Sequence, residues 1–260
     1  MNQRMRERNY RTNAIVLQCR DLGEADRIFV VFTPERGKLS VIAKGARKAS
    51  SRSGPYLDYF AEVNLELARG RDLDVVTGAS SINPHLNLRE DIDAYGHAAY
   101  LAELVRDLTQ EHQENRRIYK LLSASLALLN DQVDPWHVTR HFELGMLVAT
   151  GYQPDLLECA NCQRALEAIP NVFSPQMGGV LCPECAHLDR AGTTLSVNAQ
   201  KYVRTLARNG LAGVIRLEPD ASVRREVSGA LHAYLRQSSD RDFASLRVLG
   251  TMNGTSGGPG

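Results

Sequence analysis

Residues 26–52, DRIFVVFTPERGKLSVIAKGARKASSR, decide how the amino-terminal part of this chain folds. Two largely apolar segments, 27–32 and 38–44, are joined by a turn at 34–37 (PERG), where the glycine can adopt a positive φ. Apolar side chains occur at both odd and even positions of the first segment, so both of its faces are partly apolar. This pattern favours a small barrel over an open sheet with one solvated face.

A cationic loop follows the second segment. Its basic residues are Lys44, Arg47, Lys48 and Arg52, separated by glycine, alanine and serine. A hairpin that ends in such a loop is suited to contact a phosphate backbone. The alternative is a solvated loop that keeps an edge strand soluble, which is what most runs of like charge do.

The charge distribution favours the phosphate-binding interpretation. The whole chain has a formal net charge of +1. Residues 1–52 contain 12 arginines and lysines against 5 acidic residues, a net charge of +7, whereas residues 53–260 contain 19 against 25, a net charge of −6. A positive end on a balanced chain is typical of a nucleic-acid-binding domain, and the near-neutral total argues against a purely nonspecific polyelectrolyte binder.

Length and composition set the broad class of the protein. The 260 residues allow one large domain or two to three small ones, and 43% hydrophobic residues suffice for a core. No run approaches about 18 uncharged apolar residues, so we expect no membrane span. The basic amino terminus lacks the apolar region of a secretory signal. Four of the five cysteines form two CxxC pairs, which indicates a metal site in a reducing compartment, and so a cytoplasmic protein.

Three further segments extend the β region. We expect strands at 12–22, 59–68 and 73–77, because apolar and polar residues alternate there between turn-forming residues. Together with the hairpin these make five short strands within about 80 residues, which fits a five-stranded OB-type barrel. An SH3-like barrel would give a similar pattern, and the periodicity alone leaves both open.

After the β region, apolar residues recur at helical spacing. The helix that begins at Asp134 and Pro135 has the strongest start signal, an aspartate cap followed by proline in the first turn. The predicted helices are 92–112, 115–130, 134–151, 196–209 and 222–237.

Four cysteines, Cys159, Cys162, Cys182 and Cys185, follow the pattern C-x2-C-x19-C-x2-C. Two thiolates separated by two residues on a tight knuckle can bind one ion, and two knuckles complete a tetrahedron. Four cysteine ligands leave no position open for water, so we expect one structural zinc ion (Zn2+) per chain rather than a catalytic one. Two accidental pairs or a redox pair are the alternatives. Cys19 is expected to be an ordinary core thiol.

The expected fold class is therefore α+β and multidomain, with an N-terminal OB-type β-barrel, an α-helical domain and a four-cysteine zinc ribbon. The expected domains are an OB-fold DNA-binding domain at 1–82, a helical domain at 83–153 and 193–247, a zinc-ribbon insertion at 154–192, and a disordered tail at 248–260.

Patterns typical of catalytic sites are incomplete. His137 and His141 have the spacing of a metalloprotease pair, but Val138 stands where the glutamate is needed. Gly37 and Lys38 do not form a phosphate loop, and none of the five lysines begins a K-x-D-G nucleotidyl-transfer motif. We therefore expect a protein that is not an enzyme.

The segment 33–48, TPERGKLSVIAKGARK, followed by a helical body and a late CxxC/CxxC ribbon, resembles the RecO family of bacterial recombination mediators. The likeness extends in order over roughly residues 10–240. Its most specific parts are GKL at 37–39 and AKG at 43–45, and the segment that leads into the first knuckle, 152–162, is also typical.

The resemblance implies a non-enzymatic mediator in the bacterial cytoplasm, associated with the nucleoid. Proteins of this family bind single- and double-stranded DNA through the OB barrel and anneal complementary strands. They bind the acidic tail of single-stranded DNA-binding protein and act with RecR, and in some settings RecF, to help load RecA. The DNA-binding positions carried over to this chain are Lys38, Lys44, Arg47 and Lys48, and further Arg11, Arg27 and Arg52.

Other interpretations remain at this point. Arg116, Arg117 and Lys120 could bind the acidic tail, but a solvated helical face is the preferred reading. An enzyme that uses the barrel and ribbon as accessories is disfavoured by the missing K-x-D-G motif and the lack of room for a catalytic domain. An RNA- or ribosome-binding factor with an OB fold and zinc ribbon is the main alternative.

Overall fold

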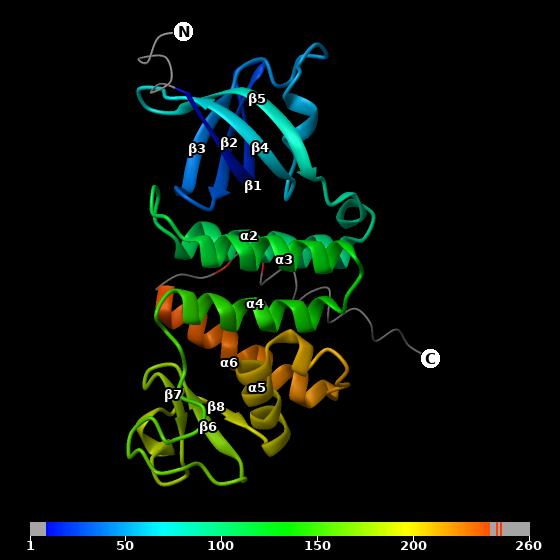
Figure 1. The fold of residues 1–260 in the computed structure, drawn as a ribbon. Helices are drawn as coiled ribbons and strands as arrows, with labels where there is room; N and C mark the ends of the chain where they lie inside the picture. Colours follow the sequence, from blue (N-terminus) through cyan, green and yellow to red (C-terminus); the bar gives the residue numbers. More distant parts are fainter. Residues whose placement is uncertain (1–8, 240–242, 244, 246–260) are drawn as a thin grey trace. The chain divides into compact units, whose positions relative to one another are not determined.

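The computed structural model describes residues 9–239, 243 and 245. Its contacts divide the chain into two compact units, Met1–Val133 with Ala244–Gly260, and Asp134–Phe243. In Figure 1 the first unit holds a strand-rich barrel with the helices α2 and α3, and the second holds α4 to α6 with a small sheet. The domain limits expected from the sequence stay predictions, and the tail at 248–260 lies outside the described residues.

Five strands form the barrel of the first unit. They are β1 (Asn9–Leu22), β2 (Asp26–Thr33), β3 (Gly37–Ala43), β4 (Glu62–Ala68) and β5 (Asp74–Asn83). The strands close in the order β1-β2-β3-β5-β4, because β1 pairs with β4 as well as with β2. All neighbouring pairs are antiparallel except β3 and β5, which are parallel. The predicted hairpin and five-stranded OB-type barrel are confirmed.

Three strand limits differ from the sequence prediction by three residues or more. β1 begins at Asn9 rather than at residue 12. β4 begins at Glu62 rather than at residue 59, because Phe60 adopts a left-handed conformation with φ of 65° and breaks the strand. β5 runs to Asn83 instead of residue 77. Its second half, residues 78–83 (GASSIN), is small and polar and lacks alternation, yet it pairs along β4.

Alternate residues of the strands fill the barrel interior. The buried interior residues include Ala14, Val16, Phe29, Val31, Leu39, Val41, Val63, Leu65 and Leu67. The opposite face of β1 and β2 is buried as well, since Ile15 and Phe32, which are partners across the two strands, have no exposed surface. α2 lies against β1 and α3 against β2. On one face of the hairpin the apolar side chains thus pack in the barrel interior, and on the other face they pack on the side covered by the helices.

Each of the two helices in this unit starts at a side-chain cap. α2 (Ile92–Leu108) begins after Asp91, whose carboxylate accepts N–H bonds from the first turn. α3 (Arg116–Asn130) begins after Asn115, whose side chain accepts the N–H of Ile118. Such caps pair backbone donors that have no partner within the helix. They confirm both predicted starts.

The predicted helix 92–112 ends early because the chain turns to meet the barrel. After Leu108 the backbone becomes extended, Glu111 bridges to Lys38, and the N–H of His112 donates to the carbonyl of Lys38 at 3.0 Å. A Cβ atom at Gly37, which has φ of 60°, would lie 1.9 Å from the carbonyl oxygen of Gln113. Glycine is therefore required there by both conformation and close approach.

Two polar contacts attach the helices to the barrel. The ammonium of Lys38 on β3 donates to the carbonyls of Arg106 and Thr109 at the end of α2, at 2.5 and 2.7 Å. A cation at this place also interacts favourably with the helix dipole. The second contact is made by Glu62 on β4, whose carboxylate accepts hydrogen bonds from the hydroxyl groups of Tyr119 and Ser123 of α3, at 2.8 and 2.9 Å.

The second unit combines three helices with a three-stranded sheet among its described residues. Its elements are α4 (Pro135–Ala149), β6 (Asn171–Ser174), β7 (Gly179–Leu181), β8 (Thr193–Leu195), α5 (Val197–Asn209) and α6 (Ala221–Ser239). The sheet order is β7-β6-β8. Asp134 and Ser196 cap α4 and α5, which confirms the starts predicted for these helices. No helix in the described part of the chain is long and apolar enough to span a bilayer.

We predict that Lys38→Met lowers the free energy of unfolding by about 1–3 kcal/mol, because it removes charge-assisted hydrogen bonds to two helix-end carbonyls. Lys120→Met, at an exposed position of α3, serves as the control and should change stability little. Urea unfolding followed by circular dichroism measures both. Equal stability of the two variants would contradict the capping role of Lys38.

Candidate metal centre and nucleic-acid interface

The four predicted cysteine ligands come together at one end of the small sheet. The sulfur atoms of Cys159, Cys162, Cys182 and Cys185 all lie within 4.8 Å of one another. The Sγ atoms of Cys162 and Cys182 are 3.8 Å apart. Tetrahedral coordination with metal–sulfur bonds of about 2.3 Å places sulfurs about 3.8 Å apart. The donor set and its spacing therefore fit one four-coordinate metal ion.

The local backbone explains how two separate segments meet there. β7 leads directly into Cys182, and the first knuckle is attached to this strand, since the N–H of Ala160 donates to the carbonyl of Val180 at 2.9 Å. Each knuckle contains a tight turn closed by a backbone hydrogen bond. The N–H of Gln163 donates to the carbonyl of Cys159 at 2.9 Å, and the N–H of Cys185 donates to the carbonyl of Cys182 at 3.0 Å.

The negative charge of four neighbouring thiolates would favour the binding of a cation. Burial raises the pKa of Cys159, but N–H groups of Cys162, Cys182 and Asn161 outweigh this effect and lower the pKa to about 6. The pKa of Cys182 is instead raised to about 12, first by burial and then by its hydrogen bond to Glu184. Four neighbouring sulfurs do not all ionise by themselves, because like charges repel at this distance. A divalent ion held by the four cysteines would compensate that charge and keep every thiol deprotonated.

Further groups surround the sulfur atoms. The amide nitrogen of Asn161 lies 3.4 Å from the Sγ of Cys185, and the backbone N–H of Cys182 donates to the Sγ of Cys159 at 3.4 Å. Arg164 and Glu184 form an ion pair of 3.3 Å between the two knuckles. With four sulfur ligands the centre has no open position for substrate or water, so it suits a structural role.

The predicted basic loop, residues 44–52, is attached to the turn between β1 and β2. The N–H of Gly45, which has φ of 65°, donates to the carboxylate of Asp26 at 2.7 Å. The N–H of Arg47 donates to the carbonyl of Ala25 at 2.9 Å. The guanidinium of Arg47 also lies 3.5 Å from the carboxylate of Asp21. The loop is thus fixed by backbone contacts rather than by its basic side chains, except at Arg47.

A hollow of about 340 Å³ opens beside this loop. Three of the predicted DNA-binding residues, Lys44, Lys48 and Arg52, line it together. Its other lining residues are Ala43, Gly45, Ser50, Ser51, Ser53, Val76 and Thr77. Three cations and several hydroxyl groups around one concave surface are a suitable set of donors for phosphate oxygens.

Of the four remaining predicted positions, Arg47 lies in the loop itself, and the other three lie elsewhere on the barrel and contact other protein groups. Lys38 binds the end of α2, as described above. Arg27 pairs with Asp21 at 2.9 Å, and this hydrogen bond raises its pKa. Arg11 forms an ion pair with Glu66. These residues do not join Lys44, Lys48 and Arg52 in the hollow, and a role for them in binding DNA stays a prediction.

The hydroxyl groups of the hollow were not identified from the sequence. The serine-rich run 50–53 gave a signal, since serines beside lysines are common phosphate ligands. No sequence signal indicated Thr77, because this residue comes next to the loop only through the pairing of β3 with β5.

Cations on α3 behave as a solvated face. Arg116, 60% exposed at its side chain, pairs with Glu114 at 2.9 Å and Glu35 at 3.6 Å. Arg117 and Lys120 are exposed. This arrangement agrees with the preferred reading of these three residues.

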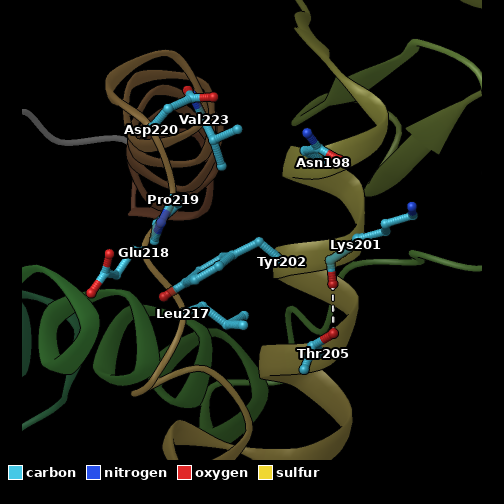
Figure 2. A pocket seen from close by; sticks show the side chains of 9 residues that line it. All are labelled: Asn198, Lys201, Tyr202, Thr205, Leu217, Glu218, Pro219, Asp220 and Val223. Carbon is cyan, nitrogen blue, oxygen red and sulfur yellow. Dashed lines mark hydrogen bonds between the residues drawn. The ribbon is translucent and has the colours of Figure 1, made fainter.

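A second cavity, of about 470 Å³, lies in the other unit between α5 and the chain that enters α6. Figure 2 shows Tyr202, Leu217 and Val223 facing this space. The hydroxyl of Tyr202 is 2.7 Å from His137, whose other ring nitrogen is 3.1 Å from the carbonyl of Leu217. Burial lowers the pKa of His137. This histidine therefore supports the cavity wall. As Val138 in place of the glutamate already indicated, it is not part of a metalloprotease pair.

We predict that the purified protein carries about one metal ion per chain, and that Cys182→Ser loses it and melts at a lower temperature, because metal binding is coupled to local folding. Cys19→Ser is the matched control, since Cys19 lies on β1 of the other unit and is not one of the four clustered cysteines, and it should retain the metal. Elemental analysis and thermal melting measure both effects. Full metal occupancy in Cys182→Ser would exclude the four-sulfur site.

Comparison with known proteins agrees with this geometry. The model of the family "Recombination protein O N terminal" matches residues 5–85, which include the barrel strands. The model "Recombination protein O C terminal" matches residues 89–247.

Individual relatives match along nearly the whole chain. A protein of Roseiflexus sp. (strain RS-1) named DNA repair protein RecO is 41% identical over 247 residues, which span 94% of this chain and 86% of the relative. Proteins of the same name from Dehalococcoides mccartyi (strain ATCC BAA-2266 / KCTC 15142 / 195) and Symbiobacterium thermophilum are 34% and 33% identical, over 94% of this chain and 96% and 97% of the relatives. On the strength of both family models and of these relatives, the chain belongs to the RecO family.

Proposed function

We propose that this protein is a DNA-binding recombination mediator of recombinational DNA repair. The observation that carries the proposal is the hollow on the barrel, where Lys44, Lys48 and Arg52 converge with hydroxyl-bearing side chains. The relatives bear the name DNA repair protein, which makes DNA the expected source of the phosphates.

Electrostatics support the assignment of this surface. All three cations of the hollow are exposed, so a phosphate can reach them without the cost of opening the fold. Phosphate contacts by lysine and arginine supply affinity that does not depend on base sequence. A mediator that handles strands of any sequence needs this kind of binding.

The proposed activity is to anneal complementary single strands and to help load RecA onto DNA coated with single-stranded DNA-binding protein. We propose the acidic tail of that protein and RecR as partners, with RecF in some settings. Annealing requires binding and alignment of strands but no covalent step, so the proposal needs no catalytic group. The closed four-sulfur centre agrees with a protein that is not an enzyme.

For the metal we propose zinc. Tetrahedral sites of four cysteine thiolates are typical of structural zinc, although iron and iron–sulfur clusters use the same ligands. The four cysteines would hold the ion, which would supply a rigid cross-link between the two knuckles. A colourless protein with zinc by elemental analysis supports this assignment, whereas visible absorption from iron would overturn it.

We predict that Lys44, Lys48 and Arg52 changed together to Ala weaken DNA binding steeply at moderate salt. Each lost phosphate contact should lower the slope of log K against log[salt] by about 0.7 for single strands and 0.9 for duplex. A slope reduced by about 2 to 3 is therefore expected, measured by fluorescence anisotropy at several salt concentrations.

The control for this experiment changes Arg71, Arg117 and Lys120 to Ala, three exposed cations of the same unit outside the hollow. This control variant removes the same total charge as the variant of Lys44, Lys48 and Arg52, which we call the hollow variant. If this control loses affinity and the hollow variant does not, the hollow is not the site that binds DNA. RNA of equal length in a parallel titration tests for an RNA-binding factor, which would prefer it over single-stranded DNA.

We predict that the protein accelerates annealing of complementary strands already coated with single-stranded DNA-binding protein, and that it does so without ATP. The hollow variant should anneal more slowly, because it holds the strands less tightly. Annealing is followed by the quenching of a dye pair on the two strands. A rate equal to that without protein, or an absolute need for ATP hydrolysis, would count against the proposed activity.

A further inference from the structure

Tyr59 is presented at the surface by an unusual backbone segment. The next residue, Phe60, is left-handed with φ of 65°, and so is His85, with φ of 45°. The N–H of Phe60 donates to Val16, and its carbonyl is 2.9 Å from the ring of His85. Such conformations in residues other than glycine cost free energy and are common at binding sites. Here they turn Phe60 into the interior while Tyr59 stays 38% exposed.

The ring of Tyr59 is held in a defined orientation. Its hydroxyl donates to the carbonyl of Cys19 at 3.1 Å. One side contacts Phe60, with ring centroids 5.9 Å apart, and Phe60 in turn lies edge-on against Tyr95 of α2, at 5.1 Å. A ring fixed in this way can accept a planar partner with little loss of side-chain entropy.

Beside Tyr59 lies a hollow of about 380 Å³, at the lower end of the range of about 300–1,000 Å³ typical of ligand pockets. Its lining residues are Cys19, Arg20, Asp21, Arg27, Leu57, Asp58 and Tyr59. The charges balance, two arginines against two aspartates, and Arg27 is paired with Asp21. A hollow without net charge suits a neutral polar ring better than a phosphate.

This hollow adjoins the cationic loop along one row of the barrel. Asp21 on β1 is the partner of Arg27 on β2, which is the partner of Ala43 on β3, the residue before Lys44. Neighbouring strands are about 4.8 Å apart, so the row spans about 10 Å.

We propose that Tyr59 is a stacking platform for an unpaired nucleobase of a DNA strand whose phosphates lie in the hollow of Lys44, Lys48 and Arg52. The proposal rests on the proposed DNA binding and adds the part of the ligand that is recognised next to it. A base within a duplex is already stacked on both faces, so Tyr59 favours single strands over duplex, whereas the cations bind both. Base–aromatic stacking tolerates every sequence.

The test is the affinity of Tyr59→Leu for single-stranded and duplex DNA of equal length. Leucine keeps an apolar side chain but removes the aromatic face. We expect single-strand affinity to fall about 5- to 150-fold, the effect of losing one stacked base, with duplex affinity and both salt slopes unchanged. Tyr59→Phe keeps the ring and loses only the hydroxyl bond to Cys19, so it should retain most of the single-strand affinity. Tyr56→Leu is the matched control, because Tyr56 is 43% exposed but lines neither hollow, and it should bind normally.

The outcomes separate this inference from the proposed function. If Tyr59→Leu binds single strands as tightly as the wild type while the hollow variant loses binding, the stacking platform is excluded and the cationic site stands. If Tyr59→Leu loses single-strand and duplex binding equally, its effect is structural and the inference is overturned. If the wild type binds neither form of DNA, the proposed function itself fails. Thermal melting of each variant confirms that the fold is retained.

Discussion

Burial of both faces of the β1–β2 hairpin is the constraint on which the first unit depends. One face, with Phe29 and Val31, fills the barrel. The other, with Ile15 and Phe32, would be exposed on an isolated barrel, and an exposed apolar patch of that kind is unfavourable. α2 and α3 cover it, so the barrel and this helix pair form one cooperative structure. Each fully buried large apolar side chain contributes about 1.5–3 kcal/mol, more than any surface ion pair in the unit.

Because of this constraint, the segment GKL at 37–39 has a structural role, which its positive charge alone does not indicate. Gly37 lets the chain after α2 pass close to β3, and Lys38 binds the carbonyls at the end of α2. Both residues join the barrel to the helices. The following loop has the opposite organisation, because backbone groups such as the N–H of Gly45 attach it and leave the side chains of Lys44 and Lys48 at the rim of a hollow. Two adjacent lysine-containing motifs thus perform different tasks, one structural and one suited to anions.

In the second unit a small number of residues specify the cluster of sulfurs. Two knuckles of CxxC bring pairs of sulfurs together by their own turn geometry, and β7 places the second knuckle beside the first. The three strands of this sheet are only three or four residues long, so the sheet buries little apolar surface by itself. A cation held by the four sulfurs would supply a cross-link, and N–H groups around Cys159 lower its pKa, so the backbone there favours a negative sulfur.

The sequence by itself determined the elements whose signals are local. Alternation predicted the hairpin, caps such as Asp134 predicted helix starts, and the spacing of Cys159 to Cys185 predicted the metal site, because each signal lies within a few residues of what it specifies. Only the tertiary structure decided which cations share a surface. Lys38, Arg27 and Lys44 look alike in the sequence. Yet Lys38 binds carbonyls distant in the chain and Arg27 pairs with Asp21 on the neighbouring strand, whereas Lys44 lines a hollow with Arg52 and Thr77. The environment of a charged side chain is set by contacts between strands and helices, and no local pattern encodes it.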